Sequence, residues 1–330
     1  MFDTTQTSHL PPDIVTRIKQ LEAKYEAMGQ DLRSYLDGLL YDDFLTYWDY
    51  INLDLLLNLQ RPITPFKDEV IFIIYHQITE LYFKLILNAL KEITNAETPL
   101  SAETFTMYLQ RVNSYFDSLI KSFEIMINGM DKEQFLKFRM SLLPASGFQS
   151  AQYRLIEIYA TDLDNLLALS ARERNLPDAE IAEKYEFLYW KQGASELATG
   201  KKTLTLQQFE QKYSALFLQL AHKNATHNVW QTYQHLPEDA QQHPSLIEEL
   251  RQFDHNANVL WPLMHFKSAV RYLQRDPEDI AATGGTNWQK YLPPKNQSII
   301  FFPTLWTEAE KKEWGKKAQL DILSSLQHHK

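Results

Sequence analysis

The chain has no cysteine, and this absence removes several kinds of chemistry at once. Disulfides, thiolate zinc sites, Cys-ligated iron–sulfur clusters and a cysteine nucleophile are all excluded, so any metal must be held by His, Asp or Glu. Basic charge is also in deficit, because 33 Lys and Arg face 42 Asp and Glu for a net charge of -9. This balance offers no footprint for nucleic acid or an acidic membrane, so a small molecule is the expected partner.

Glycine is scarce as well, with 9 in 330 residues, and neither Asp37-Gly38 nor Asn128-Gly129 is flanked by alternating apolar runs. β-Hairpins are therefore not expected. Apolar residues instead recur at spacings of three and four, which predicts helices over residues 14–28, 47–59, 70–93, 102–127, 150–169, 206–220, 246–253 and 258–273. The predicted fold is all-α, a large helical bundle forming one domain over residues 1–330, with a peripheral helical excursion near residues 172–205.

No apolar run is free of polar residues over the length of a membrane span. The most apolar stretch, residues 70–90, is interrupted by His76 and by further polar and charged side chains, so it predicts a buried helix. Prolines at 62 and 65 followed by acidic residues predict that this helix begins near Asp68. The N-terminus has acid and proline where a secretory signal has a cationic start and an apolar run, so a cytoplasmic protein is expected.

His76 lies in the middle of this apolar helix, where a buried imidazole needs hydrogen-bond partners. Glu80 and Lys84 follow at i+4 and i+8, so the three side chains share one face and can form a local polar stripe. A di-iron carboxylate site would need Glu-x-x-His motifs on two helices, and the sequence has no such repeat. This segment alone leaves open both a structural stripe and a functional histidine.

A second histidine, His265, follows Trp261 and Pro262 in another apolar segment, and Pro262 suits a first helical turn. A histidine in such surroundings is usually a hydrogen-bonded core residue. It is also what a haem needs, since one neutral imidazole binds the iron and apolar walls cover the porphyrin. Haem b has no attachment motif comparable to Cys-x-x-Cys-His, so both interpretations stay open.

Two further segments carry candidate binding residues. Arg139 has apolar neighbours and precedes Ser146-Gly147, and its fork suits a carboxylate of either a ligand or the protein. Thr283 precedes the chain's only glycine pair, which can close over a ligand or form a simple turn. The sequence lacks Gly-x-Gly-x-x-Gly, P-loop, His-Glu-x-x-His and Gly-x-Ser-x-Gly motifs, so nucleotide binding and triad hydrolysis have no support.

Taken in order, these segments resemble the tryptophan 2,3-dioxygenase family from about Tyr47 to Pro303. Each motif alone is weak evidence for the family, but the occurrence of all of them in this order is specific to it. The motifs that carry the resemblance are Thr46 to Gln60, Asp68-Glu-Val-Ile-Phe72-Ile-Ile-Tyr-His76-Gln-Ile-Thr-Glu-Leu-Tyr-Phe-Lys84, Phe138-Arg139 with Ser146-Gly147-Phe148-Gln149-Ser150, Trp261 with His265, Thr283-Gly284-Gly285, and Phe301-Phe302-Pro303.

The resemblance implies an enzyme that uses O2 to cleave the indole C2–C3 bond of L-tryptophan, giving N-formylkynurenine. This reaction is the first step of tryptophan catabolism by the kynurenine pathway. It also implies haem b, iron protoporphyrin IX that is ferrous when active, in a pocket within the helices. His265 would be the proximal iron ligand, and His76 would face the substrate's indole nitrogen from the opposite, distal side.

The same resemblance assigns the substrate pocket. Phe72 would wall the indole, Arg139 would take the substrate carboxylate, and Thr283 would bind the ammonium and carboxylate groups. Ser146 and Gly147 would line the space beside bound oxygen. The guanidinium of Arg139 and the hydroxyl of Thr283 would thus bind the charged groups of the amino acid, while its flat ring enters an apolar pocket.

The resemblance further implies a homotetramer built as a dimer of dimers. Tyr47, Tyr50 and Ile51 would then reach from a neighbouring subunit into the active site. A haem-free helical binding or scaffold protein of the same fold is the alternative from a different functional class.

Three departures from the family pattern bear on the substrate. Phe135 stands where many members have a tyrosine, Ala282 replaces a glycine before Thr283, and the stretch of residues 265–283 is longer than in familiar members. They leave open a haem enzyme of the same fold that acts on a modified tryptophan or another aromatic amino acid.

Overall fold

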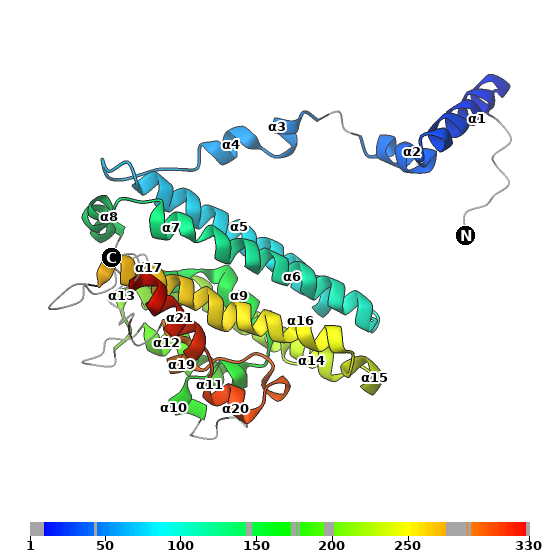
Figure 1. Cartoon of the computed structure of the whole chain (residues 1–330). Helices are drawn as coiled ribbons and strands as arrows, with labels where there is room; N and C mark the ends of the chain where they lie inside the picture. Colours follow the sequence, from blue (N-terminus) through cyan, green and yellow to red (C-terminus); the bar gives the residue numbers. More distant parts are fainter. Residues whose placement is uncertain are drawn as a thin grey trace. The chain divides into compact units, whose positions relative to one another are not determined.

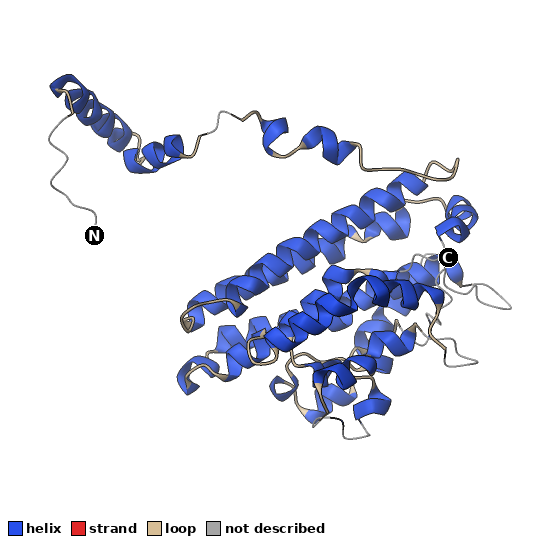
Figure 2. Cartoon of the chain, turned by 180° about the vertical axis from the view of Figure 1, so that it is seen from behind, coloured by secondary structure: helices blue, strands red, loops and turns tan. Residues whose placement is uncertain are grey.

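The structure is a computed structural model that describes residues 10–42, 45–142, 147–172, 176, 179–194, 201–274, 289 and 292–327. Within these ranges the regular elements are helical, and the isolated β-bridge between Leu167 and Leu188 belongs to no strand (Figure 2). The all-α prediction is therefore confirmed. The chain divides into two compact units, Met1–Gln60 and Arg61–Lys330. The single-domain organisation over the whole chain stays a prediction.

The first unit consists of short helices with accessible side chains. Its helices are α1 (Pro12–Ala27), α2 (Leu32–Leu40), α3 (Tyr47–Tyr50) and α4 (Leu53–Leu57), and none of its described residues is buried. The helix predicted over residues 47–59 is wrong as one element. Asn52 adopts a left-handed conformation with φ 51°, which ends one helical segment and begins the next.

The second unit is built on long packed helices. Helix α5 (Glu69–Thr94) packs against α6 (Ala102–Ser122) and α9 (Ala151–Ala160), and α16 (Pro244–His255) packs against α6 (Figure 1). Helix α5 begins directly after Asp68, as predicted. The interior between these helices is apolar and includes the fully buried residues Phe83, Ile86, Leu90, Phe105, Phe116, Phe138, Phe217, Phe253, Phe301 and Phe302.

Further helices complete this unit. The remaining α-helices are α7 (Glu124–Asn128), α8 (Lys132–Phe138), α10 (Leu169–Arg172), α11 (Ile181–Glu186), α12 (Tyr189–Gly193), α13 (Leu204–Asn224), α14 (Val229–Gln234), α15 (Glu238–Gln241), α17 (Trp261–Leu273), α19 (Pro294–Gln297), α20 (Glu308–Lys312) and α21 (Lys316–Gln327). Helices α11 and α12 lie in the predicted excursion, and their region buries Tyr185, Leu188 and Trp190.

Helix α5 has one buried face and one accessible face. Tyr75 and Leu90 are buried, whereas Ile74, Leu81 and Leu85 are 40%, 50% and 46% exposed. Helix α5 is therefore only partly buried by the described residues of the second unit. Among the described residues it is also the helix that is long and apolar enough to cross a membrane, a test that core helices of soluble proteins pass as well.

A charged network lies inside the second unit, between α9 and α12. Arg154 Nη1 lies 3.0 Å from Glu157 Oε2, and both side chains are almost fully buried. The hydroxyl of Tyr189 donates to Glu157 Oε1 at 2.5 Å and accepts from Arg154 Nη1 at 3.1 Å. Burial raises the pKa of Glu157 to about 7, even though the guanidinium of Arg154 and the Tyr189 hydroxyl oppose this shift.

This raised pKa predicts a pH-dependent stability contribution. The folded chain holds a proton on Glu157 up to about pH 7. In the unfolded chain the pKa of Glu157 has its ordinary value, so the proton is released at a lower pH. The contribution of Glu157 to the free energy of unfolding should therefore fall as pH rises through this window, by at most about 1.4 kcal/mol per pH unit. Urea unfolding of the wild type and of Glu157→Gln at pH 5, 6 and 7 measures this change. The free energy of unfolding of the wild type should fall relative to that of the variant as the pH rises. Glu183→Gln, at an exposed position of α11, is the control, and a Glu157→Gln difference that stays constant with pH would contradict the shift.

Candidate functional site

His265 lies on α17 with one ring nitrogen engaged and the other open. Its Nδ1 lies 3.1 Å from the main-chain oxygen of Trp261. A carbonyl can only accept, so Nδ1 carries the proton and Nε2 carries the lone pair. Burial lowers the pKa of His265 to about 4, which keeps the ring neutral near pH 7. A histidine that binds a metal commonly has this form, in which the other ring nitrogen donates to a carbonyl.

His76 has the same local geometry on α5. Its Nδ1 lies 2.7 Å from the main-chain oxygen of Phe72, so Nε2 is again the acceptor. The side chain remains accessible, while the surrounding protein atoms still lower its pKa. Glu80 is hydrogen-bonded to Gln152 rather than to His76, at 2.9 Å between Oε2 and Nε2. The described contacts therefore do not form the polar stripe that the spacing allowed.

A chain of aromatic rings joins the two histidines. Tyr75 lies edge-on to His76 at 6.4 Å between ring centroids and edge-on to Phe123 at 5.6 Å. Phe123 in turn lies 4.7 Å from His265, and Trp261 lies 4.6 Å from the same ring. A charge on His76 contributes to lowering the pKa of His265, after the larger effect of burial. The described contacts therefore connect the accessible His76 to the partly buried His265 through the rings of Tyr75 and Phe123.

An apolar wall stands beside His76. The Phe72 ring lies 4.1 Å from the imidazole and 5.9 Å from Phe138, between centroids. Phe135 lies 6.4 Å from Phe72 and 4.6 Å from the ring of Tyr272 on α17. A flat apolar ligand is suited to such a wall, because aromatic rings pack favourably edge-on or offset.

Arg139 comes directly after Phe138 in the sequence. It is 5% exposed and begins a short 3-10 helix, η2 (Arg139–Leu142), at the end of α8. Burial lowers the pKa of Arg139, because the surrounding protein atoms make the charged form of the guanidinium costlier than it is in water. Asp68 accepts the main-chain amide of Asp131 at 2.6 Å, so the starts of α5 and α8 are tied together. This tie joins the helix of His76 to the helix that leads to Arg139.

Glu69 secures the start of α5, a role that sequence reasoning missed. Its carboxylate is 1% exposed and accepts the amides of Ile63 and Thr64 at 2.8 Å each, as well as the Thr64 hydroxyl. Burial alone would raise the pKa of Glu69, but these hydrogen bonds outweigh it and lower the pKa. The only sequence signal was an acidic residue at a helix start after two prolines.

The contacts described above do not include the other predicted site residues. Ser146 and Thr283 lie outside the described residues. Gly147 begins the 3-10 helix η3 (Gly147–Gln149), just before α9. In the first unit, Tyr47 and Tyr50 are 69% and 74% exposed, and Ile51 is half-buried. The described contacts therefore connect His76, His265, Phe72 and Phe138, the residue before Arg139, and the functional roles of all the predicted site residues stay predictions.

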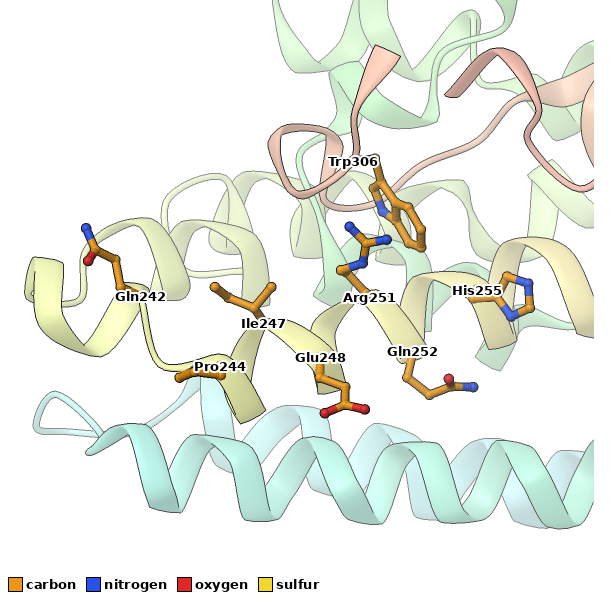
Figure 3. A pocket seen from close by; sticks show the side chains of 8 residues that line it. All are labelled: Gln242, Pro244, Ile247, Glu248, Arg251, Gln252, His255 and Trp306. Atoms are coloured by element: carbon orange, nitrogen blue, oxygen red, sulfur yellow. The ribbon is translucent and has the colours of Figure 1, made fainter. Parts of the chain in front are cut away.

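A surface groove of about 520 Å³ runs beside α16 and is separate from these residues (Figure 3). Arg251 lies 4.0 Å from the ring centroid of Trp306 and 2.5 Å from Glu310. None of the predicted site residues lines this groove, whose lining is Gln242, Pro244, Ile247, Glu248, Arg251, Gln252, His255 and Trp306. It is therefore not the candidate site.

Within the described ranges, no group of three or more His, Asp or Glu side chains could enclose a bare metal ion. The described residues thus define an all-α protein in which two histidine rings, each with Nδ1 held by a main-chain carbonyl, lie near an aromatic wall.

Comparison with known proteins gives the family. The chain matches the family model described as tryptophan 2,3-dioxygenase over residues 40–276. It is 29% identical over 283 residues to the tryptophan 2,3-dioxygenase of Polaromonas sp. strain JS666, covering 85% of this chain and 92% of the relative. It is 41% identical over 118 residues to that of Ruegeria sp. strain TM1040, covering 36% and 42%. The chain belongs to the tryptophan 2,3-dioxygenase family. The matched range includes His76, Arg139 and His265 and ends before Thr283.

The Glu69 contacts predict a local effect at the start of α5. Glu69→Gln should loosen the segment before the helix, since a buried charged acceptor of this kind contributes about 1.5–3 kcal/mol. Cleavage by trypsin after the exposed Lys67 should then become roughly tenfold faster or more. Glu92→Gln, at an exposed position near the other end of α5, should leave that rate unchanged. Equal cleavage rates in wild type and Glu69→Gln would show that the hydrogen bonds of Glu69 do not hold this segment.

Proposed function

We propose that the protein is a haem-dependent dioxygenase that cleaves the indole C2–C3 bond of L-tryptophan with O2 to give N-formylkynurenine. Family membership over residues 40–276 supports the reaction. The observation that carries the proposal is the neutral imidazole of His265, whose Nδ1 is engaged by the Trp261 carbonyl while Nε2 stays available for an iron.

The residues around His265 fit a haem. Burial keeps the imidazole neutral, and the hydrogen bond to Trp261 orients the ring and raises its basicity as a ligand. The rings of Phe123 and Trp261 stand edge-on to it and exclude water from that side. Haem iron in the ferrous state supplies the centre that binds and activates O2. The chain's part is to hold the ligand nitrogen in one orientation.

His76 would act on the substrate through its acceptor nitrogen. Its Nδ1 proton is engaged by the Phe72 carbonyl, so Nε2 can accept a hydrogen bond from the indole N–H. Its pKa is lowered, so the ring is neutral and has no charge to disturb this contact. His76 therefore orients the indole, and the proton stays on the substrate nitrogen.

The remaining substrate contacts follow from charge and shape. The Phe72 ring beside His76 would pack against the indole. The buried guanidinium of Arg139 would bind the carboxylate, and Thr283 would bind the ammonium and carboxylate groups. Ser146 and Gly147 would line the space beside bound oxygen. A zwitterion with a flat apolar ring satisfies all of these groups together.

The protein would work as a homotetramer. Ile74, Leu81 and Leu85 form an exposed apolar face on α5, and a second subunit would remove this surface from water. Tyr47, Tyr50 and Ile51 of a neighbouring subunit would then complete the substrate pocket. The exposure of Tyr47 and Tyr50 in the single chain supports this role. A cytoplasmic location stays a prediction from the sequence.

A second candidate is a haem enzyme of the same family that prefers a modified tryptophan or another aromatic amino acid. Phe135 supports it, because this ring lies between Phe72 and Tyr272 and brings no hydroxyl to the wall. Ala282 and the long stretch of residues 265–283 are the other departures. Wild-type turnover of L-tryptophan, followed by the absorbance of N-formylkynurenine, separates the two candidates.

Removal of the proposed iron ligand tests the cofactor assignment. His265→Ala should lose normal haem uptake, because it removes the ring nitrogen that would bind the iron. The absorption spectrum of the purified variant after haem supplementation measures this loss. His255→Ala, on the same helical run but lining the surface groove, should keep the wild-type spectrum. An unchanged Soret band in His265→Ala would refute the ligand assignment, and a colourless wild type would favour the haem-free scaffold.

Removal of the proposed carboxylate partner tests substrate binding. Arg139→Leu should raise KM for L-tryptophan by roughly 10-fold to 150-fold, since a hydrogen bond to a charged group contributes about 1.5–3 kcal/mol. Steady-state kinetics on the haem-loaded protein measures the change. Arg111→Leu, at an exposed position of α6, is the control and should leave KM unaltered. An unaltered KM in Arg139→Leu would count against the assignment.

A further inference from the structure

The helical run that carries His265 contains a π-helical turn just before it. This turn, Asn256–Leu260, lies between α16 and α17, and the amide of Trp261 bonds back five residues to the carbonyl of Asn256. In an α-helix the same amide would bond to Ala257. Pro262 follows and has no amide hydrogen to offer. The carbonyl of Ala257 is therefore left without a main-chain donor from its own helix.

Tyr153 supplies the missing donor from another helix. Its hydroxyl, on α9, lies 2.7 Å from the Ala257 oxygen, and the side chain is 6% exposed. Burial raises the pKa of Tyr153 well above its ordinary value, so the hydroxyl stays protonated and donates. The contact is reinforced by packing, because Phe83 lies 5.3 Å from the Tyr153 ring and 5.7 Å from that of Trp261.

Buried polar groups also support the turn from its other sides. Asp254 is fully buried and accepts from Asn258 Nδ2 at 2.8 Å, from the amide of Phe301 at 2.9 Å and from the amide of Phe302 at 3.1 Å. Asn256 Nδ2 lies 3.2 Å from Asn113 Oδ1 of α6. Such satisfied buried contacts specify one backbone geometry, because any slip would leave polar groups unpaired.

The turn bears directly on the proposed iron ligand. Trp261 ends the π-helical turn, and its carbonyl is the acceptor for His265 Nδ1. A change in the turn therefore moves the oxygen that orients the imidazole. Substitution of an outer hydrogen-bond partner of a metal-ligating histidine typically weakens metal binding by about 10-fold to 100-fold.

We propose that Tyr153 is a positioning residue for His265: its hydroxyl holds the Ala257 carbonyl, keeps the π-helical turn in place and so fixes the Trp261 oxygen that orients the ligand ring. This inference rests on the proposed role of His265 as the haem ligand. Tyr153 does not touch the iron or the substrate, and it acts through the main chain.

The test compares two tyrosines that lose the same kind of bond. Tyr153→Phe removes the hydroxyl that donates to Ala257, and Tyr233→Phe removes one that donates to the carbonyl of Gln241 at 2.9 Å in a different region. Tyr153→Phe should release haem to an apoglobin acceptor roughly tenfold faster than wild type and lower the iron–histidine stretching frequency in the ferrous protein. In the haem-free protein it should also speed amide hydrogen exchange over residues 256–266. Tyr233→Phe should leave all three measurements at wild-type values.

The possible outcomes separate the positioning role of Tyr153 from a general loss of stability and from the proposed function. Haem loss and a stretching frequency at wild-type values in Tyr153→Phe would overturn the positioning role while leaving the proposed function intact. Equal changes in both variants would show a general loss of stability and would also overturn it. Unchanged hydrogen exchange over residues 256–266 would overturn the link through the turn. A wild type that takes up no haem would overturn the proposed function itself, and the positioning role with it.

Discussion

The hydrogen bond between His265 Nδ1 and the Trp261 carbonyl is the constraint on which the site depends. It assigns the proton to Nδ1, leaves Nε2 as the available nitrogen and orients the ring, while burial keeps the imidazole neutral. His76 repeats this arrangement with the Phe72 carbonyl. Both helices thus use their own main chain to select the histidine tautomer, and each leaves one acceptor nitrogen for another group. A metal-bearing cofactor on one side and an indole N–H on the other both match that chemistry.

The long helices could be predicted because their causes are local. Apolar spacing identified α5 and α6, and the acidic start after two prolines located the first residue of α5 within one position. The prediction was wrong over residues 47–59, where Asn52 takes a left-handed conformation. It was also incomplete before His265, where residues 256–260 form a π-helical turn. Polar partners distant in the sequence stabilise that turn, and a periodicity argument does not detect them.

The candidate site was predictable as a set of residues and not as a geometry. His76, His265 and Arg139 stood out because ionisable side chains in apolar segments need a reason. Whether His265 was a core residue or a ligand could not be decided from the sequence, since both occur in apolar surroundings. The contact of Nδ1 with the Trp261 carbonyl leaves Nε2 as the acceptor nitrogen, which is the form that a metal ligand needs. The roles of Glu69 and Tyr153 depend on which main-chain groups lack partners, and only the folded chain shows which groups these are.

The sequence by itself determined the helical class, the absence of thiolate chemistry and the start of α5, because composition and spacing within a few turns are sufficient for each. The tertiary structure alone decided that the rings of Tyr75 and Phe123 connect His76 to His265, and that the Tyr153 hydroxyl meets a carbonyl 104 positions away. These contacts join helices that are remote in the chain. Packing of the whole interior brings them together, and no local pattern encodes the distance.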